Sequence, residues 1–175
     1  KGGIISFTAV DPERLLDLCK ERENKIVQLL PQLKEKQNLP KLSNQASVYQ
    51  GLRAIKSIFQ DILTYKEYLA FGEGMKTVDL LGVFFDYFQM EKRRRKMKSK
   101  IIMGLEYKNT KTVTDAYGEF RFLKEYVSPA LTYIYGDKVA IIIWSEEPTA
   151  FLIQSNQAAE SYKNYFNFLW NIAKS

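Results

Sequence analysis

Residues 131–144 have the sequence LTYIYGDKVAIIIW, and this stretch determines which fold to expect. Its two apolar runs flank Gly136-Asp137, a dipeptide that favours a tight turn, so a β-hairpin is predicted. The second run, Val139 to Trp144, is apolar throughout. Because a strand with one solvated face alternates apolar and polar residues, this run indicates a central strand covered on both faces.

The rest of the chain supplies further strands, separated by helical patterns. Short apolar segments predict strands at 4–9, 46–50, 68–71, 101–105, 120–123 and 150–154. Apolar spacings of three and four predict helices from Leu52 to about Lys66, from Lys76 to Lys98, and after Asn156 as the N-cap. Helices between strands imply parallel crossovers, whereas a hairpin is antiparallel. The expected fold class is α/β, with a mixed β-sheet flanked by helices.

An amphipathic helix precedes this α/β pattern. Asp11 suits the N-cap and Pro12 the first helical position, so the helix is predicted from Pro12 to about Leu30. Pro31 is expected to kink or break it, because proline lacks an amide donor. One face carries a stripe through which we expect two copies to dimerise: Leu15, Leu18, Arg22, Ile26, Leu29 and Leu33.

The composition excludes several classes of function. The sequence has no histidine, which removes histidine-based hydrolases and histidine-ligated zinc, and no catalytic residue, metal or cofactor is predicted. Cys19 is the one cysteine, so it has no disulfide partner within the sequence, and a cytoplasmic location is favoured. No apolar run is long enough to span a bilayer, and no membrane partner is expected. The net charge of +6 is compatible with an anionic partner.

Several segments together resemble the TrmB-like family of archaeal and bacterial transcriptional regulators. The likeness extends from about Gly3 to the end of the chain. It is carried by Val10–Leu16, Leu29–Lys34, Tyr49–Gly51 followed by Ile55, Phe59 and Asp61–Leu63, Tyr135–Ile142, and Phe168–Trp170. Since the chain starts at Lys1 rather than at a methionine, we expect it to be a fragment of a longer protein.

The resemblance implies a division into three parts. In this family a winged helix-turn-helix binds DNA, a helical linker dimerises, and a C-terminal domain with a phospholipase D-like fold senses an effector, which is a sugar in some members. Residues 1–10 would be a remnant of the wing, 11–45 the dimerisation helix and linker, and 46–175 the effector-sensing domain. The implied partners are a second copy, DNA through an upstream domain, and a small-molecule effector.

The resemblance also bears on catalysis. The phospholipase D superfamily uses an H-x-K-x₄-D motif, and where that motif would be expected this sequence has Tyr135-Gly136-Asp137-Lys138. Without the histidine there is no nucleophile, so the resemblance implies that the fold is kept and the chemistry is lost. The alternative from another class is an enzyme with this fold and a non-histidine mechanism that uses Glu73 or Asp137.

Two groups of residues are candidates for ligand binding. Gly72-Glu73-Gly74 follows a predicted strand, where ligands bind in open α/β sheets, although an ordinary strand-to-helix turn has the same pattern. Aromatic and basic side chains could line a pocket or belong to the core: Tyr107, Arg121, Tyr133, Tyr135 and Trp144.

The basic run from Lys92 to Lys100 gives a third hypothesis. Its arginines, Arg93, Arg94 and Arg95, could lie along the phosphates of a nucleic acid, which would make this chain a direct nucleic-acid-binding module. Basic residues at the end of a helix also complement its dipole and stay solvated, without any partner.

Overall fold

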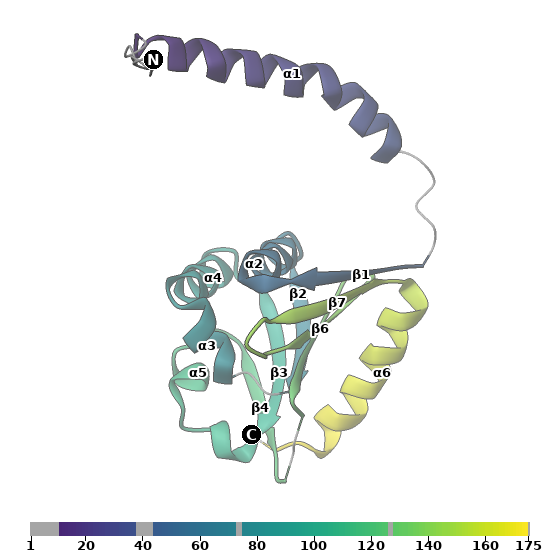
Figure 1. The fold of residues 1–175 in the computed structure, drawn as a ribbon. Helices are drawn as coiled ribbons and strands as arrows, with labels where there is room; N and C mark the ends of the chain where they lie inside the picture. Colours follow the sequence, from purple (N-terminus) through teal and green to yellow (C-terminus); the bar gives the residue numbers. More distant parts are fainter. Residues whose placement is uncertain (1–10, 38–43, 73–74, 126–127, 175) are drawn as a thin grey trace, which may run out of the picture. The chain divides into compact units, whose positions relative to one another are not determined.

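The computed structural model describes residues 11–37, 44–72, 75–125 and 128–174, and the chain divides into two compact units, Lys1–Lys41 and Leu42–Ser175. In the first unit the described element is helix α1 (Arg14–Gln37). The second unit is an α/β domain (Figure 1). The strand predicted at 4–9 and the proposed wing remnant at 1–10 lie outside the described residues.

Helix α1 is longer than predicted. The Oδ1 atom of Asp11 accepts a hydrogen bond from the amide of Glu13 at 3.0 Å, as expected of a residue at a helix start, but the helix itself begins at Arg14. It continues through Pro31 to Gln37 as one curved helix, so of the predicted kink or break the break is wrong (Figure 1). Proline keeps a helical φ and removes one amide donor, which a long helix can tolerate.

The α/β domain contains one sheet of seven strands among the described residues, in the order β1-β7-β6-β5-β2-β3-β4. Strands β2, β3 and β4 are parallel, and the other pairings are antiparallel. The elements are β1 (Gln45–Gln50), α2 (Gly51–Ile62), β2 (Glu67–Gly72), α3 (Met75–Leu81), α4 (Val83–Arg94), β3 (Lys98–Gly104), the 3₁₀ helix η1 (Leu105–Tyr107), α5 (Lys111–Thr114), β4 (Glu119–Leu123), β5 (Ala130–Tyr135), β6 (Lys138–Ile143), β7 (Thr149–Gln154) and α6 (Asn156–Ile172).

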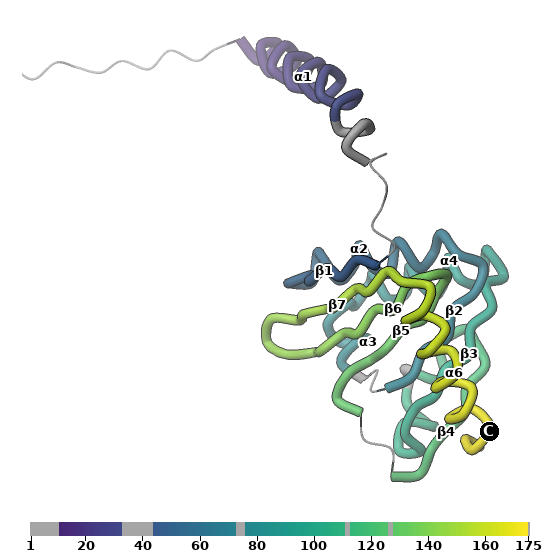
Figure 2. The backbone as a smooth tube through the Cα atoms, turned by 90° about the vertical axis from the view of Figure 1, so that its right-hand side faces the viewer, coloured from purple at the N-terminus to yellow at the C-terminus, as the bar shows by residue number. Residues whose placement is uncertain are grey.

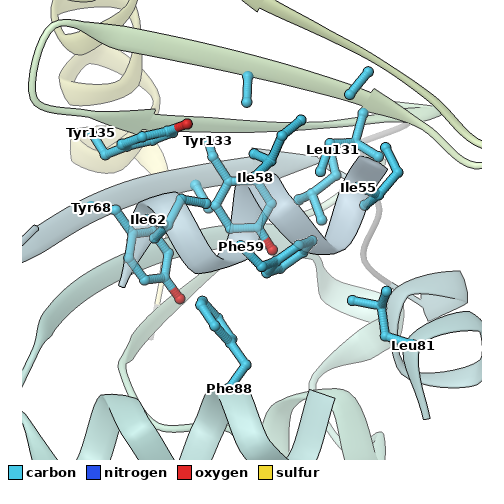
Figure 3. Close-up of a cluster of buried hydrophobic side chains, with 14 of the residues drawn as sticks. Ile55, Ile58, Phe59, Ile62, Tyr68, Leu81, Phe88, Leu131, Tyr133 and Tyr135 are labelled. Carbon is cyan, nitrogen blue, oxygen red and sulfur yellow. The ribbon is translucent and has the colours of Figure 1, made fainter. Parts of the chain in front are cut away.

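Helices cover both faces of this sheet. Helices α2, α3 and α4 lie on one face and α6 on the other (Figures 1 and 2). The first face carries the larger core, in which Phe59 of α2 makes edge-to-face contacts with Phe88 and Tyr133, with ring centroids 5.0 and 5.3 Å apart (Figure 3). The second core forms between the sheet and α6, around Phe166 and Trp170. The predicted mixed sheet between helical layers is confirmed.

The hairpin has the predicted form. Strands β5 and β6 pair antiparallel, with Tyr135 opposite Lys138, and Gly136 turns the chain with a φ of +54°. In β6, Val139 belongs to the core under α6, whereas Ala140 and Ile142 belong to the core under α2, α3 and α4. The strand is therefore covered on both faces, as its unbroken apolar sequence indicated.

Three predicted boundaries are wrong. The helix expected from Lys76 to Lys98 is two helices, because Gly82 has a φ of +51° that interrupts the helical geometry. The N-cap of α6 is Ser155, whose Oγ accepts from the amide of Ala158, and Asn156 is the first helical residue. Strand β3 begins at Lys98, three residues before the predicted start, since backbone pairing with β2 continues into its polar end.

Candidate functional site

The carboxyl end of β2 is shaped by Gly72. This residue has a φ of +124°, and a Cβ built on it would lie 2.0 Å from the carbonyl oxygen of Ala130 in the neighbouring strand β5. The close approach of β5 thus accounts for glycine here without a ligand. Glu73 and Gly74, the other residues predicted to bind ligand at this place, lie outside the described residues.

Tyr135 lies at the opposite end of the sheet from Gly72. Strand β5 runs antiparallel to β2, so Leu131 is opposite Gly72 while Ile134 is opposite Leu69. Figure 3 shows the Tyr135 side chain among the residues of the larger core. Burial, followed by the negative charge of Asp61, raises the pKa of the Tyr135 hydroxyl above its usual range, so Tyr135 stays a neutral donor.

A network of hydrogen bonds joins the side chain of Tyr135 to those of Asp61 and Lys138. The Oδ2 atom of Asp61 accepts from the Tyr135 hydroxyl at 3.1 Å and from Lys138 Nζ at 2.6 Å. Burial lowers the pKa of Lys138, but the hydrogen bond and charge of Asp61 outweigh this effect and raise it. The network connects α2 to the β5–β6 hairpin and holds the lysine charged.

A small polar cavity of about 270 Å³ adjoins this network between β1, β7 and α2. Its lining includes Asp61, Lys138, Ser57 and the amides of Gln45 and Gln154. Neither of the two charges on its wall is free, because they neutralise each other. The cavity offers hydrogen-bond donors and acceptors with little net charge, which suits a small polar molecule.

We expect Asp61→Asn to destabilise the α/β domain by about 1–3 kcal/mol, since Lys138 would lose its counter-charge while remaining largely buried. The matched control is Asp79→Asn, which neutralises an exposed carboxylate on α3. Urea unfolding of both variants measures the difference. Equal unfolding midpoints for the two variants would show that the Asp61 network contributes nothing to stability.

The other predicted ligand residues have structural contacts elsewhere in the domain. Arg121 Nη1 donates to the carbonyl of Trp170 at 2.8 Å, and its guanidinium lies 4.5 Å from the centre of the indole ring. Tyr133 and Trp144 are buried in the larger core, and Tyr107 lies in η1 after β3. The structure therefore does not gather the predicted ligand-binding residues into one pocket, and their role stays a prediction.

Arginines of the basic run are held by a carboxylate of their own helix. Arg94 donates twice to Glu91 at 2.8 Å, and Arg95 donates to Glu91 at 3.0 Å and to the carbonyl of Leu63 at 2.7 Å. The hydrogen bonds from Arg94, and then those from Arg95, lower the pKa of Glu91 to about 2. Glu91 is ionised at neutral pH and fixes both guanidinium groups at the end of α4.

Arg93 is also anchored, because its Nη2 atom donates to the carbonyl of Asp115 at 2.6 Å. All three arginines nonetheless keep exposed surface. Their internal contacts explain their presence without a nucleic acid, and contact with DNA stays a prediction. The neighbouring residue of the run, Lys92, is fully buried, which the charge pattern did not indicate.

Sequence reasoning did not find the charged groups that the fold brings together. Asp61 and Lys138 are 77 positions apart, and no local pattern joins them. A detectable signal existed at Lys98 and Lys100, which alternate along a strand and so share one face of the sheet. It was missed because the strand was predicted to start at Ile101. Among the described residues no three metal-ligating side chains lie close enough to hold an ion.

The sheet and its two helical layers define a phospholipase D-like fold. No family model matches the sequence, and no curated protein matches it. NucT from Helicobacter pylori aligns with a TM-score of 0.59 and 14% identity, covering 75% of this chain and 99% of NucT. Nuc from Salmonella typhimurium, a phospholipase D family member, aligns with a TM-score of 0.55 and 12% identity, covering 75% and 97%.

A third solved structure is similar over more of the chain. TrmBL2, described as an archaeal chromatin protein with a novel mode of DNA binding, aligns with a TM-score of 0.52 and 16% identity. The alignment covers 93% of this chain, which spans 66% of the length of TrmBL2. Identities this low show a shared fold. No helix in the described part of the chain is long and apolar enough to cross a membrane.

Proposed function

We propose that this chain is the non-catalytic effector-binding and dimerisation region of a TrmB-like transcriptional regulator in the cytoplasm. An upstream winged helix-turn-helix would bind DNA, and the α/β domain would couple the binding of a ligand or partner to that activity. The observation that carries the proposal is the extent of the TrmBL2 alignment. The alignment covers 93% of the chain. The α/β unit, Leu42–Ser175, has 134 of the 175 residues, which is less than this share, so the alignment also includes residues of the unit that contains α1.

Helix α1 supports the dimerisation part of the proposal. Its apolar side chains are exposed on the helix: Leu15 is 66%, Leu18 52%, Ile26 60% and Leu29 52% exposed. An apolar stripe of this length on a helix favours pairing with a like helix, because pairing removes the stripe from water. A second copy is the occupant that the family resemblance implies.

The absence of histidine from the sequence supports a non-catalytic role. Of the two acids in the enzymatic alternative, Asp137 lies within the described residues. Its side chain accepts a hydrogen bond from Gln154 at 3.0 Å, and its carbonyl accepts one from the amide of Ser155. These contacts join the β5–β6 hairpin to the end of β7. Turnover of a phosphodiester by this chain, abolished by Asp137→Asn, would instead establish the enzymatic alternative.

Regulation would work through a shift in population between two arrangements of the dimer. A ligand that binds one arrangement of the α/β domain more tightly favours that arrangement, by no more than its difference in affinity for the two. The helix α1 of each copy would transmit the change to the DNA-binding heads. The proposal thus requires both a dimer and a ligand site, which can be tested separately.

We expect the chain to sediment as a dimer, and Leu18→Glu with Leu29→Glu to convert it into a monomer, because two charges would be buried in the paired stripe. Leu16→Glu with Val27→Glu is the matched control. These positions are equally apolar and exposed, but they lie about a third of a turn away from the stripe. Analytical ultracentrifugation measures the result, and circular dichroism checks that the α/β domain remains folded.

A wild-type chain that stays monomeric at high concentration would contradict the dimer proposal. A dimer that survives the stripe variant but not the Leu16 and Val27 variant would place the interface on another face of α1.

A further inference from the structure

A second cleft, of about 480 Å³, lies between α6 and the amino ends of β2 and β3. It is at the opposite end of β2 from Gly72, and its walls come from both the sheet and the helix. Lys66, Lys98 and Lys100 line it from the sheet side, and Lys163 and Asn167 line it from α6. Figures 1 and 2 both show α6 along this face of the sheet.

The charge of the cleft is strongly unbalanced. Four lysines line it against one carboxylate, Glu67. Among the described residues, none of these lysines takes part in an ion pair. Four ammonium groups collected around one cavity with a single carboxylate, Glu67 opposite Lys98, give it a positive potential, and a bound anion relieves their repulsion.

The geometry of β3 explains why the lysines converge. Lys98 and Lys100 are two positions apart on the strand, so both point to the α6 face. Lys100 Nζ lies 5.3 Å from the centre of the Trp170 ring, which holds the side chain beside α6. From the other wall, Lys163 Nζ donates to the carbonyl of Gly136 at 3.2 Å and is half-buried.

The remaining wall of the cleft indicates the kind of anion. Leu69 and Ile134 give it an apolar floor, and the aromatic ring of Tyr65 stands at its edge. A volume of about 480 Å³ is within the range of pockets that enclose an organic ligand and is larger than an inorganic anion needs. Its cations are lysines, which bind phosphate as point charges.

We propose that this cleft binds a small organic phosphate, with the phosphate among Lys66, Lys98 and Lys163 and the organic part against Leu69 and Ile134. This molecule is the effector of the α/β domain, a statement that rests on the proposed function. The adjoining hollow shares Lys98 and Lys100, reaches Arg93, and contains one carboxylate, Glu119, so its lining also carries a net positive charge. A ligand with two or more negative charges is therefore favoured over one with a single charge.

The test is calorimetric titration of the full chain with matched pairs of compounds: glucose 6-phosphate with glucose, and AMP with adenosine. Inorganic pyrophosphate and a short DNA duplex are titrated in parallel. We expect at least one ester to bind, its dephosphorylated partner to bind at least about tenfold more weakly, and the affinity of the ester to fall as salt is raised.

Two variants with equal loss of charge locate the site. Lys66→Gln with Lys98→Gln removes two exposed lysines from the cleft, and Lys124→Gln with Lys174→Gln removes two exposed lysines elsewhere in the domain. The first variant is expected to weaken ester binding at least about tenfold and the second less than about twofold, since only the first changes the site. Thermal unfolding verifies that both are folded.

The outcomes separate this proposal from the proposed function. Equal loss in both variants, no discrimination between ester and parent compound, or binding of duplex DNA or pyrophosphate alone would overturn the organic phosphate site and leave the dimer untouched. Release of inorganic phosphate from the bound ester would confirm the site while contradicting the non-catalytic function. A monomeric chain that binds the ester in the cleft would likewise retain the site and remove the proposed regulatory dimer.

Discussion

Replacing Gly72 with alanine is expected to destabilise the α/β domain by at least about 3 kcal/mol, and the variant can fail to fold. The added Cβ would lie 2.0 Å from the carbonyl oxygen and 3.0 Å from the carbonyl carbon of Ala130. These are backbone atoms of β5, in the middle of the sheet, so relief of the clash requires β2 and β5 to separate where they pair. The φ of +124° adds strain for any residue with a Cβ.

Gly51→Ala is the matched control for this prediction. Gly51 also has a positive φ, +80°, but a Cβ there would meet nothing within 4 Å. Gly51→Ala is expected to cost only the strain of a positive φ, about 1 kcal/mol. Urea unfolding of the two variants thus separates the clash from the strain, and equal losses would contradict the close approach of β5 to Gly72. If the Gly72→Ala variant does not fold while the Gly51→Ala variant does, the prediction is also confirmed.

Replacing Lys92 with methionine is expected to stabilise the domain by about 1–3 kcal/mol at pH 7. Lys92 is fully buried on α4, and its Nζ lies 5.0 Å from the Tyr68 ring centre and 5.5 Å from that of Phe88. Its polar contact is with Gln89 Oε1 at 3.3 Å, and in the part of the chain that the structure describes no carboxylate pairs with it. Methionine fills a similar volume, and Gln89 still accepts from the amide of Tyr117.

The same residue makes the stability depend on pH. Burial, followed by the charge of Arg93, lowers the pKa of Lys92 from 10.5 to about 7. Between these values the unfolded chain binds a proton that the folded chain does not, so the free energy of unfolding rises as pH rises from about 7 towards 10. Below pH 7 both states are protonated, and the cost of burying the charge is present in full.

Unfolding free energies measured in urea between pH 7 and 9.5 test this expectation. The rise with pH should disappear in Lys92→Met and persist in Lys56→Met, which removes a lysine that lies over the Phe84 ring at the surface. The range ends at pH 9.5 because burial raises the pKa of Tyr68 and of Tyr133, so unfolded tyrosines lose protons above it and oppose the trend. A pH profile unchanged by Lys92→Met would show that the ammonium group is solvated in the folded chain.

Much of the fold was predictable because it follows from local periodicity. The apolar run Val139 to Trp144 and the turn at Gly136 determine a central strand and its hairpin, and both are confirmed. The boundaries failed where one residue overrides the pattern. Gly82 interrupts an apolar helix because its φ is positive. Pro31 was expected to kink or break its helix, but the helix continues through it. Neither result can be derived from spacing.

The candidate sites were far less predictable. Gly72 and Tyr135 were both predicted to bind ligand, and the antiparallel pairing of β2 with β5 puts them at opposite ends of the sheet. The basic run was treated as one surface, yet it includes the buried Lys92 and arginines bound to Glu91. Charge and residue type indicate the chemistry available to a chain, whereas burial and pairing determine which groups can use it.

By itself, the sequence determined that this protein has an α/β pattern preceded in the sequence by an amphipathic helix, and that it lacks the histidine of the phospholipase D motif. These properties depend on composition and on periods of two to four residues. Only the tertiary structure decided that Asp61 neutralises Lys138, and that Lys66, Lys98 and Lys163 face one cleft. The physical reason is that strand order and register bring distant residues together, and local periodicity does not encode either of them.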